Sequence, residues 1–385
     1  MWSSTRRLYP CLVVLAGCGD GSGPGIAEGQ VAVPLTAAAD FSCAIDALDA
    51  GWCWGNGTTG QLGNGDTSNS VRPVAMAGGH RFIAVSGGSY HACALEGDST
   101  AWCWGTNFSG RLGTGSLTGR EPIALPVAGG HHYVRLSAGG VHSCGLLAGG
   151  AAECWGENGL GELGTGDTVA SSSPAAVATG LRFTLVTAGD FHTCALDLRG
   201  AAWCWGANHR GQLGTGDTAA STVPRPVMGS HTFVAVDAGA FYTCGLAADG
   251  QAWCWGNHLT GELGDGRTYA FPVPDPVPVV GNRAYVALAT GVSHSCAITA
   301  TGDAWCWGSS VYGKLGDGSA APITVPVLVS GGHYFVAIAA GGNHSCAATQ
   351  SHVIYCWGRN SSGQLGAGST SDALEPVAIT PVTTF

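Results

Sequence analysis

The sequence predicts an all-β protein, a seven-bladed β-propeller with four antiparallel strands and one cysteine pair in each blade. The tripeptide CWG occurs seven times, at residues 53, 103, 154, 204, 254, 306 and 356, in steps of 50 to 52 residues. A second cysteine precedes each CWG cysteine by ten residues, and a variant of GQLGxG follows each CWG. Short strand-like segments at even spacing, punctuated by Gly and aromatic residues, are typical of propellers.

Each repeat unit contains four predicted strands. The first is a segment of small and β-branched residues such as TFVAVDAG at 232–239, which suits the crowded centre of a propeller. Two cysteine-bearing strands follow, and a Pro-flanked apolar run such as REPIALPV at 120–127 completes the unit. The seven units span 31–385 as one domain. Either each blade is self-contained, or the tail PVTTF at 381–385 pairs with the beginning of the domain.

The spacing of ten residues fits two cysteines that face each other across a β-hairpin. With residues 248–250 as a three-residue turn, Cys244 faces Cys254 at a non-hydrogen-bonded site, where the Cα atoms lie about 4.5 Å apart. This separation is within the disulfide range of about 4.4–6.8 Å. Gly takes the third turn position in four units, and the other units have Asp49, Ser99 and His352 there. A left-handed conformation suits Ser99 least well.

The cysteine pairs have three possible roles: disulfides, free buried thiols or metal ligands. In five units a His lies two residues before the first cysteine, but Phe41 and Tyr242 replace it in the other two, which keep both cysteines. A ligand set that is incomplete twice favours disulfides over metal, so no metal site is expected. The predicted disulfide cysteines are Cys43, Cys53, Cys93, Cys103, Cys144, Cys154, Cys194, Cys204, Cys244, Cys254, Cys296, Cys306, Cys346 and Cys356.

The histidines of the HxC motif, at positions 91, 142, 192, 294 and 344, are expected to form a partial ring near one mouth of the propeller channel. A structural role, in which each imidazole bonds the backbone of the neighbouring blade, is favoured over metal binding. The tryptophans beside each second cysteine are expected to fill the gaps between blades. Glu153 replaces one of them, and a water-exposed blade edge explains it better than a catalytic acid does.

The N-terminus reads as an export signal. Arg6 and Arg7 precede an apolar run from Leu8 to Ala16 that is too short to span a membrane. The tetrapeptide ending at Cys18 resembles the lipobox of bacterial lipoproteins, which implies a signal peptide at 1–17 and a lipidated Cys18; an ordinary secretory signal is the alternative. Residues 18–30 then form a Gly-rich tether. Gly19 in place of Asp directly after the lipidated cysteine favours the outer membrane or cell surface.

The repeat motif, in full HSCAL, a Gly turn and AWCWGxNxxGQLGxG, resembles that of the regulator of chromosome condensation repeat family. The resemblance covers nearly all of 31–385 and implies a seven-bladed propeller with a protein-binding face. Members of the family include a nuclear exchange factor for a small GTPase and a secreted inhibitor of β-lactamase. Exchange activity fits this chain poorly, because an exported protein would not meet such a GTPase. Nucleosome binding needs a basic surface, but 15 Lys and Arg oppose 25 Asp and Glu.

No motif for catalysis or cofactor binding is found, including GxSxG, HExxH, a phosphate-binding loop and a dinucleotide fingerprint. The sequence therefore predicts a non-enzymatic, monomeric scaffold without a cofactor, which binds a protein or a glycan and no nucleic acid. The alternatives are a guanine-nucleotide exchange factor-like regulator, which the family resemblance implies, and a secreted enzyme inhibitor or carbohydrate-active propeller. The irregular connection at 265–280 contains Tyr269 and Phe271, which either contact a partner or pack on the outer strand.

Overall fold

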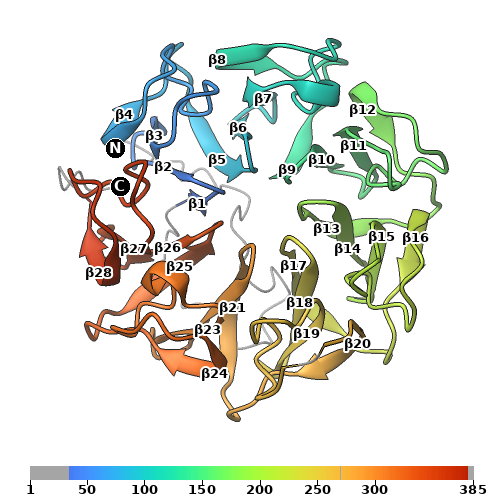
Figure 1. Ribbon diagram of the computed structural model, residues 1–385. Helices are drawn as coiled ribbons and strands as arrows, with labels where there is room; N and C mark the ends of the chain where they lie inside the picture. The colour runs from blue at the N-terminus through green and yellow to red at the C-terminus, as the bar shows by residue number, and fades with distance from the viewer. Residues whose placement is uncertain (1–33, 269, 380–385) are drawn as a thin grey trace, which may run out of the picture.

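The computed structural model describes residues 34–268 and 270–379, and it confirms the predicted seven-bladed propeller. Seven four-stranded sheets surround a central channel, with the first strand of each blade innermost and the fourth at the periphery (Figure 1). Two short 3-10 turns are the only helical elements within the described residues. No helix in these ranges has the length and hydropathy needed to cross a bilayer.

The strands of blades 1 to 4 are β1 (Leu35–Ala37), β2 (Phe41–Ile45), β3 (Gly51–Gly55), β4 (Ser70–Ala75); β5 (Phe82–Gly87), β6 (His91–Glu96), β7 (Ala101–Thr106), β8 (Arg120–Pro126); β9 (Tyr133–Ala138), β10 (His142–Leu147), β11 (Ala152–Gly156), β12 (Ser171–Ala176); β13 (Phe183–Ala188), β14 (His192–Asp197), β15 (Ala202–Gly206) and β16 (Ser221–Pro226). Those of blades 5 to 7 are β17 (Phe233–Ala238), β18 (Tyr242–Ala247), β19 (Ala252–Gly256), β20 (Val273–Pro278); β21 (Tyr285–Thr290), β22 (His294–Thr299), β23 (Ala304–Gly308), β24 (Ile323–Leu328); β25 (Phe335–Ala340), β26 (His344–Thr349), β27 (Ile354–Gly358) and β28 (Ala373–Ala378).

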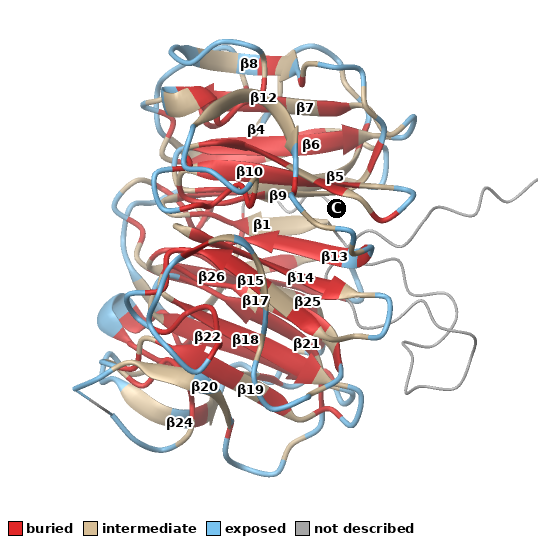
Figure 2. Cartoon of the chain, turned by 90° about the vertical axis from the view of Figure 1, so that its right-hand side faces the viewer, coloured by how far each residue is buried: buried red, intermediate tan, exposed pale blue. Residues whose placement is uncertain are grey.

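Every blade is built from four strands that are consecutive in the chain and antiparallel. The loops that join strands 1–2 and 3–4 therefore lie at one end of the propeller, here named the mouth face. The 2–3 hairpin turns and the connections between blades lie at the other end, here named the turn face. In Figure 2 buried strands fill the body, and the exposed segments gather in loops at the two ends.

The ring closes by packing blade 7 against blade 1. Strand β1 contacts β25 and β26, and the amide of Gly342 donates to the carbonyl of Ala38 at 3.0 Å. Each sheet is self-contained within the described residues, as one of the two predicted alternatives required. The tail at 381–385 lies outside them.

The hairpin register is confirmed. Cys244 pairs with Cys254 and Gly245 with Trp253, and the Cα atoms of the cysteines lie 4.1 Å apart. All seven predicted disulfides are present, one between the second and third strand of each blade. Asp49, Ser99 and His352 adopt φ values of 65°, 72° and 63°, so the turn keeps its left-handed residue even where that residue is not Gly.

The hydrophobic core is divided into one buried cluster at each blade interface. The indole of Trp255 in blade 5 is fully buried against residues of blade 4, including Cys204 and Leu213, and its Nε1 donates to the carbonyl of Gln212 at 2.9 Å. This confirms that the second tryptophan of each unit fills the gap between blades. The first tryptophan is half-buried; that of blade 4, Trp203, donates to Asp197 at 3.2 Å.

The expectation for Glu153 was wrong. Its carboxylate is largely buried, and it accepts hydrogen bonds from Tyr133 Oη at 2.7 Å and pairs with His131 Nδ1 at 2.5 Å. A carboxylate removed from water needs such partners. Five of the other innermost strands also begin with Phe or Tyr at the position of Tyr133, so the unusual residue here is Glu153 rather than the tyrosine.

Candidate functional site

The histidines of the HxC motif lie between blades, where each contacts a hydroxyl of the next blade. His192 Nε2 lies 2.8 Å from Thr243 Oγ1, and Thr243 Oγ1 donates to the carbonyl of Gln212 at 2.8 Å. A hydroxyl has one proton, and here the carbonyl receives it, so the His192 Nε2–H must be the donor. The other ring nitrogen, Nδ1, is then unprotonated, and it is buried without a hydrogen-bond partner among the described residues.

This arrangement recurs at five of the seven blade interfaces: His91–Ser143, His142–Thr193, His192–Thr243, His294–Ser345 and His344–Ser42. At the interface of blades 5 and 6, Tyr242 and Ser295 take these positions with their oxygens 3.0 Å apart. At the interface of blades 1 and 2, Phe41 and Ala92 share one buried apolar cluster. The polar or apolar character of the two partners is therefore matched at every interface.

The prediction for these histidines was correct in class and wrong in detail. They are structural, but they bond a side-chain hydroxyl rather than backbone, and all five are fully buried between blades rather than placed at the channel mouth. Burial lowers the pKa of His142, His192 and His344 to about 3, since a protonated ring would carry its charge and a second N–H into a site that offers no acceptor. The signal in the sequence was the residue between His and Cys, which carries a hydroxyl in six of the seven units.

The mouth face is formed partly by the 3–4 loops, whose conformation depends on the residue before the Leu of GxLG. Where this residue has an acceptor, the side chain bonds its own loop: Gln212 Oε1 accepts from the amide of Arg210 at 2.9 Å. Arg111 and Lys314 cannot accept this bond, and their loops form 3-10 turns at Phe108–Gly110 and Val311–Gly313. The loop residues Ser109 and Tyr312 there adopt φ values of 58° and 69°.

The two cations reach instead to the next blade. Arg111 Nη1 donates to the carbonyl of Gly140 at 3.0 Å, and Lys314 Nζ donates to Asn343 Oδ1 at 3.1 Å. Burial lowers the pKa of Lys314 to about 8. Each of these side chains thus ties a 3–4 loop to the 1–2 loop of its neighbour.

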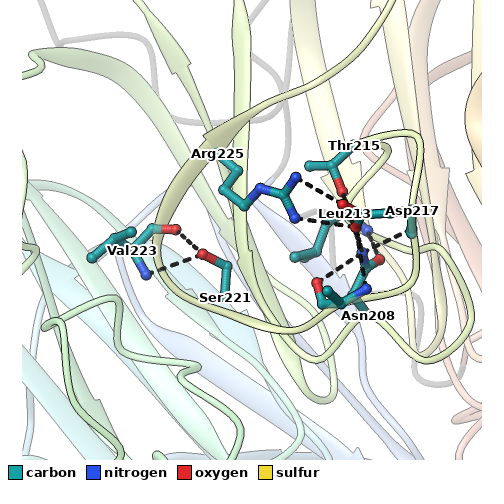
Figure 3. A network of polar contacts seen from close by, with 8 residues as sticks. Asn208, Leu213, Thr215, Asp217, Ser221, Val223 and Arg225 are labelled. Atoms are coloured by element: carbon teal, nitrogen blue, oxygen red, sulfur yellow. Dashed lines mark hydrogen bonds and ion pairs between the residues drawn. The ribbon is translucent and has the colours of Figure 1, made fainter.

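The 3–4 loops are further held by internal polar contacts, as blade 4 illustrates (Figure 3). Asn208 Oδ1 accepts from the amide of Leu213 at 3.0 Å, and its Nδ2 donates to Thr215 Oγ1 at 3.2 Å. Arg225 pairs with the carboxylate of Asp217 through two nitrogens, at 3.1 and 2.9 Å. Such loops present their outer side chains from a fixed backbone.

The rim of the channel is made by the 1–2 loops. Amide-to-carbonyl bonds join neighbouring loops, including Gly140 to Gly189 at 3.1 Å and Asp190 to Gly239 at 3.3 Å. The rim encloses a cavity of about 80 Å³, and the channel below it holds about 240 Å³. At the position of Asp190 in the repeat, the other six blades have a small or aliphatic residue (Ala39, Ser89, Gly140, Ala240, Val292 and Gly342), and of these all but Gly140 line the rim cavity with Asp190.

A second carboxylate lies inside the channel. Asp237 accepts hydrogen bonds from the amide and hydroxyl of Thr290 at 2.7 and 3.0 Å and from the hydroxyl of Thr187 at 3.1 Å. Burial raises the pKa of Asp237, although these bonds oppose the shift. Arg135 also lines the channel. Sequence reasoning assigned no role to Asp190 or Asp237, because only the ring geometry brings these strand ends together.

Exposed apolar side chains surround the mouth. They come from the 1–2 and 3–4 loops of several blades and include Tyr90, Phe108, Leu160, Leu259, Phe271, Val311 and Tyr312. On blades 4 and 5 the rings of Phe191 and Phe241 stack with centroids 5.5 Å apart, and His209 meets Phe241 edge-on. Exposed apolar groups gathered on one face commonly mark an interaction site.

The predicted partner residues are only partly described. Phe271 is 80% exposed, which excludes packing on the outer strand, whereas Tyr269 lies outside the described residues. Cys18 and the tether also lie outside them. Within the described ranges, no group of three or more His, Cys, Asp and Glu residues is arranged to hold a metal ion.

Models of known protein families match most of this chain. The model of the RCC1-like domain matches residues 120–384, and models of the regulator of chromosome condensation (RCC1) repeat match residues 52–95 and 82–111. The chain belongs to the RCC1-like domain family. None of the curated proteins compared with this RCC1-like chain matches it.

Solved structures share the fold of this RCC1-like propeller. Prp20p from Saccharomyces cerevisiae is 24% identical, with 89% of this chain and 86% of that chain covered and a TM-score of 0.77. Human WBSCR16 is 20% identical, with 87% and 93% covered and a TM-score of 0.74. The ectodomain of the Arabidopsis thaliana receptor kinase ACR4 is 20% identical, with 92% and 100% covered and a TM-score of 0.55.

Proposed function

We propose that this RCC1-like propeller is a non-catalytic, extracytoplasmic scaffold that binds another protein through its mouth face. The observation that carries the proposal is the set of exposed apolar side chains around the mouth, of which Phe108 and Phe271 are 61% and 80% exposed. The loop that carries Phe108 is held by Asn107, which accepts from the amide of Leu112 and donates to the carbonyl of Ser116, so little conformational entropy is lost there when a partner docks. Aromatic side chains of this kind commonly dominate binding energy at protein interfaces.

The seven disulfides support a place outside the cytosol, because thiols are kept reduced in the cytosol. Similar folds serve as binding proteins and as an ectodomain: Prp20p is described with its binding to Gsp1p and histones, and the ACR4 fold is that of a receptor ectodomain. The predicted export signal favours a partner on the outer side of a membrane over a cytosolic one. An unidentified glycan remains the alternative ligand.

Site-specific photo-crosslinking tests the binding face. A photoreactive amino acid is placed at Phe108 or Leu259 on the mouth face, or at Leu198 on the turn face, which is more exposed than either. We expect the two mouth-face positions to capture the same protein in intact native cells and the turn-face position to capture none. Capture from the turn face alone, or equal capture from both faces, contradicts the proposal.

We further propose that Cys18 carries a lipid and that the propeller is held at the outer membrane or cell surface. Metabolic labelling with an alkyne fatty acid should label the wild-type protein and the Cys11→Ser variant, because Cys11 falls within the removed signal. The Cys18→Ser variant should remain unlabelled. Labelling that survives Cys18→Ser rules out this anchor without affecting the proposed binding face.

A further inference from the structure

We propose that the channel mouth is a subsite for one cationic side chain, an arginine or lysine that the protein partner projects into it. The inference rests on the proposed function in one respect, namely that the partner is a protein. The subsite consists of Asp190 of blade 4 and the rim cavity that it lines, and the stacked pair Phe191–Phe241 of blades 4 and 5 lies beside it on the mouth face.

Asp190 is held across the rim by its surroundings. Its Oδ1 accepts a hydrogen bond from Ser89 at 3.2 Å, although Ser89 belongs to blade 2 and Asp190 to blade 4. The carboxylate passes over Gly140 of the intervening blade: a Cβ at residue 140 would lie 2.7 Å from Asp190 Oδ1. The absence of a side chain at Gly140 therefore leaves room for the carboxylate to lie over the opening.

This carboxylate lacks a cationic partner within residues 34–268 and 270–379. None of the ion pairs there includes Asp190, and the neighbouring cation Arg111 uses its guanidinium on the carbonyls of Gly140 and Phe108, each at 3.0 Å. Among the described residues its carboxylate accepts one long hydrogen bond, from Ser89 at 3.2 Å. A carboxylate largely removed from water, with one neutral donor, gains most from a cation.

The shape and lining of the mouth select the kind of cation. A cavity of about 80 Å³ is far below the roughly 300–1,000 Å³ of a small-molecule pocket, but it can accept the head of one long side chain. Outside the cavity lining, Phe191 directly follows Asp190 in the chain and stacks on Phe241 of blade 5, and aromatic faces favour guanidinium and alkylammonium groups. Deeper in the channel the lining includes the carboxyl group of Asp237 and the guanidinium of Arg135.

The test uses two probes of the same shape, N-acetyl-arginine amide and its neutral analogue N-acetyl-citrulline amide. Binding is followed by NMR through the amide shifts of the rim glycines in the purified propeller. We expect millimolar affinity for the arginine probe and at least about tenfold weaker binding of citrulline, the loss expected when a charge-assisted hydrogen bond is removed. Equal binding of the two probes, or no binding of either, overturns the proposal.

Two variants locate the effect, and a third serves as the matched control. Asp190→Asn should abolish the preference for arginine. Gly140→Ala should weaken it while keeping the charge, because the added Cβ would lie 2.7 Å from both the Cα and the Oδ1 of Asp190 and so displaces that residue. Asp66→Asn removes an exposed carboxylate from a 3–4 loop of the same face and should leave the preference unchanged. A preference that survives Asp190→Asn, or falls equally in Asp66→Asn, shows that the site is elsewhere or that the effect is only the net charge.

The inference and the proposed function can fail separately. If Phe108 crosslinks a partner and Asp190→Asn leaves both the yield and the probe binding unchanged, the face binds protein but the cation subsite is wrong. If arginine binds in an Asp190-dependent way and no mouth-face position captures a protein, the subsite stands and the proposed function is wrong.

Discussion

Acid should unfold this propeller, and the five histidines between the blades supply the reason. Burial lowers the pKa of His192 to about 3, whereas an exposed imidazole in the unfolded chain titrates near 6.5. Between these two values the unfolded chain binds a proton at this site and the folded chain does not. The free energy of unfolding therefore falls as the pH is lowered from about 6.5 toward 3, and it is fully present above that window.

The size of the effect follows from the two pKa values. Going from pH 7 to pH 5, one such histidine lowers the free energy of unfolding by about 2 kcal/mol. Several of them together remove an amount comparable with the whole stability of a domain, about 5–15 kcal/mol. Asp190 and Asp237, whose pKa values burial raises, act in the opposite direction.

The chain supplies its own control at the interface of blades 1 and 2, where Phe41 and Ala92 replace the polar pair. The double variant His192→Phe/Thr243→Ala copies that interface into blades 4 and 5. Its loss of stability between pH 7 and pH 5 should be smaller than that of the wild type by about 2 kcal/mol. Comparing variants removes the contribution of the carboxyl groups, which all of them share.

Urea unfolding at pH 7 and at pH 5, followed by tryptophan fluorescence with the disulfides intact, measures this difference. The reciprocal variant Phe41→His/Ala92→Ser should lose about 2 kcal/mol more than the wild type over the same interval. If all three proteins lose the same amount, the imidazoles are not neutral in the folded state and the assigned direction of the hydrogen bonds is wrong.

Three further predictions concern stability at neutral pH, each measured by urea unfolding. Replacing both Cys244 and Cys254 by Ser should lower the free energy of unfolding by about 2–3 kcal/mol. If the variant is as stable as the oxidised wild-type protein, this bridge does not form. Ser99→Gly should stabilise the protein by about 0.5–1 kcal/mol, because φ is 72° there; a loss instead would point to a role for the hydroxyl. Gly214→Ala should cost about 2 kcal/mol or more, since φ is +70° and the Cβ would lie 2.7 Å from Trp255 Nε1; an unchanged stability would mean that this loop can shift.

The seven-bladed architecture was predictable because the same motif occurs seven times at nearly constant spacing. The period fixed the number of blades, and the ten-residue spacing fixed the hairpin register that places Cys244 opposite Cys254. Both depend on contacts between residues close in the chain. The turn residue Ser99 was also placed correctly, although its side chain is poorly suited to the left-handed conformation it adopts.

What could not be predicted depends on contacts between blades. The partner of His192 lies 51 residues away, and that of Asp190 lies 101 residues away in a blade that is not even adjacent. The 3-10 turns before Arg111 and Lys314 likewise form because these two side chains have no hydrogen-bond acceptor for the loop amide. A strand pattern does not reveal this difference. Glu153 was misjudged for the same reason, because His131 comes from the connection between blades.

The disulfides join strands only within a blade, so no disulfide crosses a boundary between blades. A gene duplication that inserts one more unit must therefore satisfy only the chemistry of the two boundaries it creates. A copy of blade 4 placed beside blade 4 brings both an imidazole and a hydroxyl, whereas one placed between blades 1 and 2 would set its hydroxyl against Phe41 and its imidazole against Ala92. Growth of such an array is thus easier at some positions of the ring than at others.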